Sequence, residues 1–107
     1  MVEKSIIEIV KRYLSQLAPE GIHARQAVLY GSYARGEAGP DSDLDLIVIA
    51  PELEGELTIE TVKKLWRVAS ESDNRIEPIP CGVEEWNSDT GRPILEIAKK
   101  EGLIIQN

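Results

Sequence analysis

Two short apolar runs, at residues 26–30 and 43–50, constrain the fold of this 107-residue chain more than any other feature. Both are too short to form helices, and the first is followed at once by a glycine, so each predicts a buried β-strand. The segment between them, residues 31–42, is rich in Gly, Ser and Pro. It predicts a loop with room for one helical turn. A chain with such strands must build a sheet and cover it with helices.

Three segments supply those helices. The first two have apolar residues at helical spacing. The second and third carry local boundary signals, which are Thr58 as an N-cap, Pro93 at a first helical position and Gly102 just past an end. The predicted helices cover residues 6–17 with an end near 19–21, residues 59–72, and residues 93–101.

A third strand is predicted at residues 75–80, and residues 103–105 add a last one. Pro78 and Pro80 lack amide hydrogens, and residues i and i+2 of a strand aim their backbone groups toward the same lateral edge. This edge should therefore be unpaired, so the third strand borders the sheet. The order of helices and strands is typical of a two-layer α/β fold, and we expect one domain over residues 1–107.

Two acids mark the start of the second strand. Side chains alternate along a strand, so Asp43 and Asp45 lie on one face with Cα atoms about 6.6 Å apart. Two such acids repel each other, and burying either of them unpaired is costly. A divalent cation resolves that conflict, since carboxylates suit Mg²⁺, and two ions about 3.5–4 Å apart fit between them.

The turn after the first strand offers a site for phosphate. Gly31 permits close backbone approach, and Ser32 opens a turn whose free amides, with the serine hydroxyl, can receive phosphate oxygens. Phosphate donors and metal carboxylates joined by a short loop predict a site for a metal-bound nucleoside triphosphate. The chemistry of such a site is phosphoryl or nucleotidyl transfer.

Two other motifs are excluded by single residues. Gly31 and Gly36 are spaced as in a P-loop, but Glu37 stands where the lysine of that motif must be. The acids from Asp41 onward imitate an EF-hand loop, but Leu46 replaces the glycine that the loop needs for its turn.

The sequence Gly-Ser-Tyr-Ala-Arg-Gly at residues 31–36, followed by Ser-Asp-Leu-Asp-Leu at residues 42–46, resembles the signature of the DNA polymerase β-like nucleotidyltransferase superfamily. The short chain is similar to its minimal nucleotidyltransferase branch. The resemblance implies a mixed β-sheet with helices packed on one side. It also implies that residues 1–107 form one minimal nucleotidyltransferase domain.

The same resemblance assigns roles to particular residues. Gly31 and Ser32 are expected to bind the triphosphate of ATP, and Asp43 and Asp45 to hold two Mg²⁺ ions. A third carboxylate on a neighbouring strand completes the catalytic and metal-binding set in this family. Glu77 is the candidate, although the family more often has aspartate at that place.

The function implied is Mg²⁺-dependent transfer of AMP from ATP to a hydroxyl acceptor. The resemblance points to a tyrosine of a HEPN-domain ribonuclease toxin, with this chain as the antitoxin. Two alternatives stay open. One is a binding module that neutralises a toxin by contact alone. The other is transfer to a small molecule such as an aminoglycoside.

The net charge limits the kinds of partner that the chain can bind, and the cysteine content bears on its cellular location. Twelve basic and nineteen acidic residues give a net charge of −7, which argues against direct binding of nucleic acid or an anionic membrane and suits a basic partner. The single cysteine, Cys81, cannot form an internal disulfide, and the N-terminal residues do not resemble a signal peptide, so a cytoplasmic location is expected. Homo-oligomerisation stays open.

Three side chains outside the motif carry expectations of their own. Arg35 is expected to pair with a nearby acid such as Glu37 or Asp41. Trp66 falls on the apolar face of its helix and is expected in the core. Trp86 lies in a polar stretch, where it could cover the edge of the core or anchor a partner.

Overall fold

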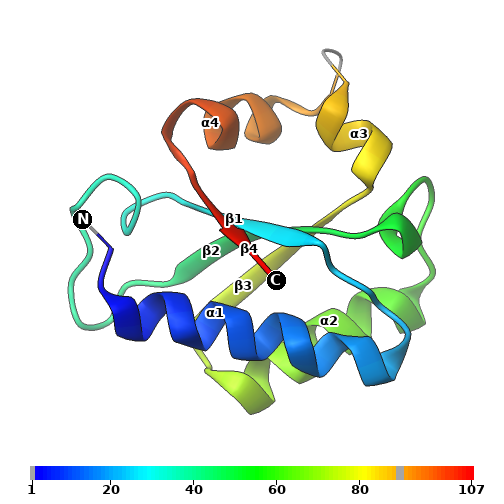
Figure 1. The fold of residues 1–107 in the computed structure, drawn as a ribbon, viewed down its shortest axis with the longest axis horizontal. Helices are drawn as coiled ribbons and strands as arrows, with labels where there is room; N and C mark the ends of the chain where they lie inside the picture. Colours follow the sequence, from blue (N-terminus) through cyan, green and yellow to red (C-terminus); the bar gives the residue numbers. More distant parts are fainter. Residues whose placement is uncertain (1, 89–90) are drawn as a thin grey trace.

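The computed structural model describes residues 2–88 and 91–107, which fold as a four-stranded sheet with helices on both faces (Figure 1). Within that part of the chain, two short 3₁₀ turns, Ala18–Glu20 and Pro51–Leu53, accompany the regular elements. The helices and strands follow in the order α1 Lys4–Leu17, β1 Gln26–Tyr30, β2 Leu44–Ile49, α2 Ile59–Ser72, β3 Ile76–Cys81, α3 Val83–Asn87, α4 Pro93–Glu101 and β4 Leu103–Gln106.

Most element boundaries match the local signals in the sequence. β1 coincides with its predicted range, and β2 and β3 differ from theirs by one residue at each end. α2 begins directly after Thr58, whose side-chain oxygen accepts a hydrogen bond from the Thr61 amide at 3.2 Å. α4 starts at Pro93, as predicted, and a last strand follows it.

The sheet is mixed, with strand order β3-β2-β1-β4. β1 runs antiparallel to β2 and β4, whereas β2 and β3 run parallel. The carbonyls of Arg75 and Cys81 accept hydrogen bonds from amides at the two ends of β2, at 2.8 and 3.1 Å. The backbone amides and carbonyls of the odd-numbered residues of β3 therefore point toward β2. Those of Pro78 and Pro80 point away from the rest of the sheet. The prediction that this strand borders the sheet is confirmed.

The mixed α/β class is confirmed, but the helices do not all pack on one side. α1 and α2 cover the face that carries Leu44, Leu46 and Val48. The shorter helices α3 and α4 cover the opposite face, where Ile47 and Ile49 lie (Figure 1). The physical reason is the continuous apolar run in β2, because a strand that is apolar on both faces must be covered on both.

Helix α3 was not predicted. Its first amides, those of Glu84 and Glu85, donate to the carboxylate of Glu54 at 2.9 and 3.2 Å. Trp86 from this helix packs against the core on the α4 side, and the Lys99 ammonium lies 5.2 Å from the centre of its ring. Trp86 thus covers the edge of the core, which was one of its two expected roles.

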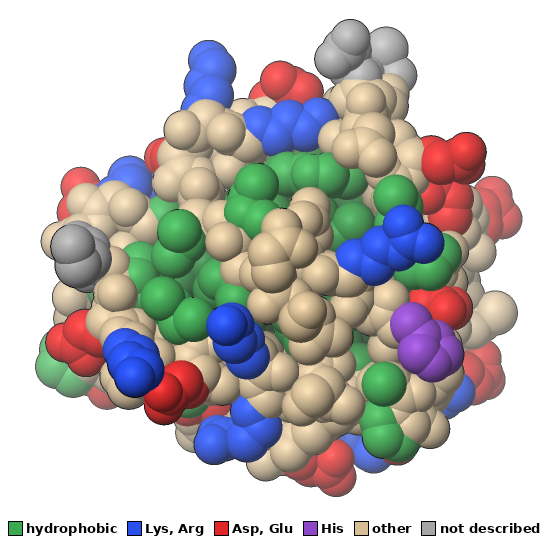
Figure 2. All heavy atoms as spheres, viewed as in Figure 1, with side chains coloured by type: hydrophobic (Ala, Val, Ile, Leu, Met, Phe, Trp, Pro, Cys, Tyr) green, Lys and Arg blue, Asp and Glu red, His purple; other side chains and the backbone are tan. Residues whose placement is uncertain are grey.

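Figure 2 shows the molecular surface in the same view as Figure 1. Hydrophobic side chains gather near the middle of this view, with charged side chains of both signs around them. Three exposed apolar residues come from α4 and from the border strand β4, namely Ile97, Leu103 and Ile104. Among the described residues, no helix combines the length and the hydropathy needed to cross a membrane.

Candidate active site

Tyr30, Asp45 and Glu77 stand side by side in register on β1, β2 and β3. Their side chains therefore share one face of the sheet, the face that α3 and α4 partly cover. Asp45 and Glu77 are partly exposed, and Asp43 lies exposed just before β2 begins. The sheet thus brings the three predicted acids to one corner, even though Glu77 is more than thirty residues away in sequence.

Burial and mutual repulsion act on these acids together. Burial raises the pKa of Asp45, and the charge of Asp43 raises it further, against a hydrogen bond with Glu77 and the charge of Arg35. Burial also raises the pKa of Glu77, followed by the charge of Asp43 and then that of Asp45. The neighbouring Tyr30 has its pKa raised to about 12 by burial and by the charges of Asp45 and Glu77. The corner is therefore an electrostatically unfavourable place for carboxylates, as expected of a site that binds cations.

Gly31 connects the phosphate-binding turn to this corner. Its φ is +77°, and a Cβ atom at this position would collide with Oδ2 of Asp45. The carbonyls of Gly31 and Ser32 accept hydrogen bonds from the amides of Arg35 and Glu37 at 3.1 and 2.9 Å, which close the turn. Gly31, one of the two predicted phosphate-binding residues, thus lies against Asp45, a predicted metal ligand.

One ionic link joins this turn to helix α4. The Arg35 guanidinium pairs with Glu37 at 2.7 Å and with Glu101, at the end of α4, at 3.1 Å. The pairing with Glu37 confirms the expectation. The pairing with Glu101 could not be predicted, because it joins residues 66 positions apart.

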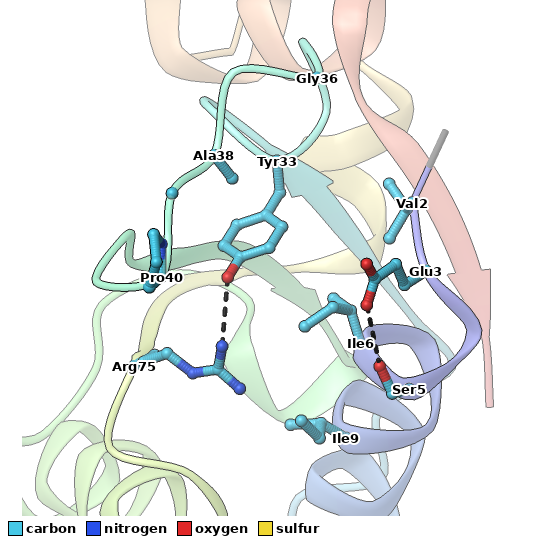
Figure 3. Close-up of a pocket in the computed structure, with 11 residues that line it drawn as sticks. Val2, Glu3, Ser5, Ile6, Ile9, Tyr33, Gly36, Ala38, Pro40 and Arg75 are labelled. Carbon is cyan, nitrogen blue, oxygen red and sulfur yellow. Dashed lines mark hydrogen bonds between the residues drawn. The ribbon is translucent and has the colours of Figure 1, made fainter.

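A second link fastens the same turn to the start of β3 (Figure 3). The Arg75 guanidinium donates to the Tyr33 hydroxyl at 3.1 Å and to the Asp73 carboxylate at 2.9 and 3.0 Å. Tyr33 follows Ser32, and Arg75 precedes Glu77 by two residues. The pair therefore fixes the position of the predicted phosphate-binding turn relative to the strand that carries the third predicted acid.

Two hollows lie near the turn. The larger, of about 580 Å³, opens between the turn and the start of α1, where Tyr33 and Arg75 meet the apolar side chains of Ile6 and Pro40 (Figure 3). It contains none of the three predicted acids. The smaller, of about 250 Å³, contains two of them and is lined by Tyr30, Asp45, Trp66, Glu77, Pro78 and Ile79.

The prediction for Trp66, which lines the smaller hollow, is wrong. It was expected in the core, but 45% of it is exposed. The buried face of α2 consists of Leu65, Val68 and Ala69, and Trp66 follows one position around the helix from Leu65. Its ring therefore reaches the side of the sheet formed by β3, where it lines the smaller hollow together with Pro78 of that strand.

The carboxylates suit a magnesium ion by their chemistry. Asp45 and Glu77 face each other across neighbouring strands, Asp43 adds a further carboxylate, and carboxylate oxygens are the ligands that Mg²⁺ prefers. Within residues 2–88 and 91–107, however, no group of three His, Cys, Asp or Glu side chains is arranged closely enough to hold an ion. Metal binding by Asp43, Asp45 and Glu77, and phosphate binding by Gly31 and Ser32, stay predictions.

Comparison with known proteins gives the same fold. The family model for the nucleotidyltransferase domain matches residues 7–102. A toxin–antitoxin crystallised with AMP-PNP has 18% identity and a TM-score of 0.62, over 94% of this chain and 73% of the other. A proposed nucleotidyltransferase from Sulfolobus solfataricus has 15% identity and a TM-score of 0.58, over 92% of this chain and 77% of the other. No curated protein sequence matches the chain significantly.

Proposed function

The chain belongs to the nucleotidyltransferase domain family, whose model spans most of its length, and on that basis we propose that it transfers AMP from ATP to a hydroxyl group on a partner protein. It is a transferase by family. The observation that carries the more specific proposal is the contact between Gly31 and Asp45, which brings a phosphate-binding turn against an acidic corner. The donor phosphates and the acids that would bind their Mg²⁺ counter-ions would then meet at one point.

The donor half of the reaction uses residues near this contact. The amides of the turn at Gly31 and Ser32 would receive the β- and γ-phosphates. Asp43, Asp45 and Glu77 would hold Mg²⁺, which supplies charge neutralisation and polarises the α-phosphate when bound. The protein contributes mainly by positioning the groups and by its fixed charges.

The transfer itself is a substitution at the α-phosphorus. The acceptor oxygen forms a bond to phosphorus, and the bond from phosphorus to the oxygen bridging the β-phosphate breaks. Pyrophosphate leaves with that oxygen, AMP stays on the acceptor as a phosphodiester, and the hydroxyl proton passes to the Glu77 carboxylate. Glu77 suits this step because it lies next to Asp45 on the outer strand.

For the acceptor we propose a tyrosine on a HEPN-domain ribonuclease toxin in the cytoplasm, with this chain as its antitoxin. One of the similar folds belongs to a toxin–antitoxin, which supports a toxin as partner. The net charge of −7 supports a basic partner surface. ATP is the proposed donor.

The test uses α-labelled ATP, Mg²⁺ and the co-expressed product of the neighbouring reading frame. Asp43→Asn and Asp45→Asn are each expected to lower transfer by about 10²-fold or more, the loss typical of removing an electrostatic catalytic group. Asp41→Asn, an exposed acid on the same loop, serves as the control and should keep its activity. An unlabelled partner of unchanged intact mass after reaction with the wild type would contradict the proposal.

A second candidate is neutralisation of a toxin by contact alone. The observation that favours it is Glu77, which stands where the family more often has aspartate. An Asp43→Asn/Asp45→Asn double variant distinguishes the two functions. Full neutralisation of the toxin by this variant would establish the contact mechanism, whereas loss of neutralisation would support transfer.

A further inference from the structure

Trp66 occupies a place that the reaction as described so far does not use. It lies on the rim of the hollow that contains Asp45 and Glu77, although its helix, α2, packs on the opposite face of the sheet. It reaches the hollow beside the border strand, where Pro78 and Ile79 add apolar lining. The rim thus carries an exposed aromatic ring next to the predicted catalytic acids.

The order of groups across the sheet indicates from which side the acceptor would approach. The phosphate-binding turn follows β1, Asp45 lies on β2, Glu77 lies on β3, and Trp66 stands beyond that border. In phosphoryl and nucleotidyl transfer, the attacking and leaving oxygens lie roughly in line on opposite sides of phosphorus. Because the pyrophosphate would leave toward the turn at Gly31 and Ser32, the acceptor must approach from the side of Trp66.

The size of the hollow limits what can approach. Pockets that take whole drug-sized ligands measure roughly 300–1,000 Å³. At about 250 Å³, this hollow is below that range and suits one inserted side chain rather than a molecule of several rings. An indole ring pairs well with another aromatic ring, stacked or edge to face.

We propose that the exposed indole ring of Trp66 is the docking platform for the tyrosine acceptor of the proposed reaction, and that this ring selects a phenol over an aliphatic hydroxyl. The inference rests on the proposed function and adds a residue that selects the acceptor. The phenol ring contacts the Trp66 indole, and its oxygen then lies on the Glu77 side of the α-phosphate. The bonds formed and broken are those of the transfer already described.

The experiment measures AMP transfer from α-labelled ATP with Mg²⁺ to two small probes, N-acetyl-tyrosinamide and N-acetyl-serinamide. Trp66→Ala should raise the KM for the tyrosine probe about tenfold, the scale of one lost aromatic pair. The kcat, transfer to the serine probe and binding of a non-hydrolysable ATP analogue should stay unchanged. Trp66→Phe should restore most of the KM.

Ile59→Ala is the matched control. Ile59 lies on the same helix, is 69% exposed and does not line the hollow, so its removal should leave the KM unchanged. The inference is overturned if Trp66→Ala leaves the tyrosine KM unchanged, or if it weakens the ATP analogue instead, since Trp66 would then hold the donor base. It is also overturned if the wild type cannot use the tyrosine probe. The proposed function fails separately, in the labelling of the partner protein.

Discussion

Gly31 is the residue at which the two halves of the proposed donor site, the turn and the acids, meet. Its positive φ and its contact with Asp45 both demand glycine, so the same residue shapes the turn and leaves room for the acid. Gly36 has a similar φ of +72°, but a Cβ there would meet nothing within 4 Å. The two glycines therefore separate the cost of backbone strain from the cost of crowding the acid.

We expect Gly36→Ala to lower the free energy of unfolding by about 1–2 kcal/mol, the cost of a left-handed conformation for alanine. Gly31→Ala should cost about 1–3 kcal/mol more, because its methyl group displaces the Asp45 carboxylate. It should also lower AMP transfer, unlike Gly36→Ala. Urea unfolding of both variants measures the difference, and equal losses would show that the contact with Asp45 has no energetic weight.

Asp73 makes a pH-dependent contribution at the base of the Tyr33–Arg75 link. Its hydrogen bond with the Arg75 guanidinium holds its pKa below the ordinary value. A lowered acid pKa stabilises the fold above the ordinary value of about 3.9, and this stabilisation is lost as the pH falls through the folded-state pKa. Asp73→Asn should cost about 1–2 kcal/mol at pH 7, the weight of a charged hydrogen bond.

As the pH falls through the lowered folded-state pKa of Asp73, the variant should approach the wild type in stability, because Asp73 is then protonated in both folded and unfolded chains. Chemical unfolding at a series of pH values measures this. Asp41→Asn provides the control, since Asp41 is exposed. A cost that does not change with pH would mean that Asp73 acts through packing and not through its charge.

At the scale of elements, the sequence predicted what local patterns encode. Thr58 and Pro93 set helix starts through their own side chains, and the two prolines of β3 set a sheet border. Helix α3 escaped prediction because its first amides are satisfied by Glu54, about thirty residues earlier in the chain. A cap supplied by tertiary contact leaves no local signal.

In the candidate site too, locally encoded features were predicted, whereas features that depend on tertiary contacts were not. The turn at Gly31 and the acids at the start of β2 form one local motif, and strand alternation predicted which residues of β3 share a face with Glu77. The pairing of Glu77 with Asp45 depends on the register of β2 and β3, which the sequence did not specify. The position of Trp66 depends on how α2 is rotated against the sheet. Helical periodicity alone could not separate its flank from its buried face.

The docking of α3 can be tested at Gly82, which precedes this helix. Gly82 has φ −75°, so alanine fits its backbone, but a Cβ there would collide with Glu54. We expect Gly82→Ala to lower the free energy of unfolding by about 1–3 kcal/mol, the usual cost of overpacking. The fluorescence of Trp86, on the same helix, should also change.

Gly39→Ala is the matched variant for this experiment, since a Cβ at Gly39 meets nothing within 4 Å. Its unfolding free energy should stay within about 0.5 kcal/mol of the wild type, as for most surface substitutions. If Gly82→Ala were equally neutral, Glu54 could move aside freely, and it would not hold α3 in place.

At the scale of the whole molecule, β2 joins two separate cores, one under α1 and α2 and the other under α3 and α4. Cys81 belongs to the second core and is fully buried. Burial raises the pKa of its thiol to about 11. It is the single cysteine of the chain, so its reactivity reports on opening of that core alone.

We expect Cys81 to react with a thiol reagent at pH 8 at least 10²-fold more slowly in the folded protein than in urea, because labelling requires opening of the structure. The rate in dilute urea should follow the unfolding free energy measured by circular dichroism. Fast labelling under native conditions would instead show that the α3–α4 side opens without global unfolding.

The two borders of the sheet are chemically unequal. At β3 the outward positions include Pro78 and Pro80, which have no amide hydrogen to offer, whereas β4 ends the sheet with Leu103 and Ile104 exposed and no proline. A foreign strand can therefore extend this sheet in one direction only. Such lateral growth would proceed away from the acids, so the border that carries the predicted catalytic residue Glu77 stays terminal and accessible however many strands are added.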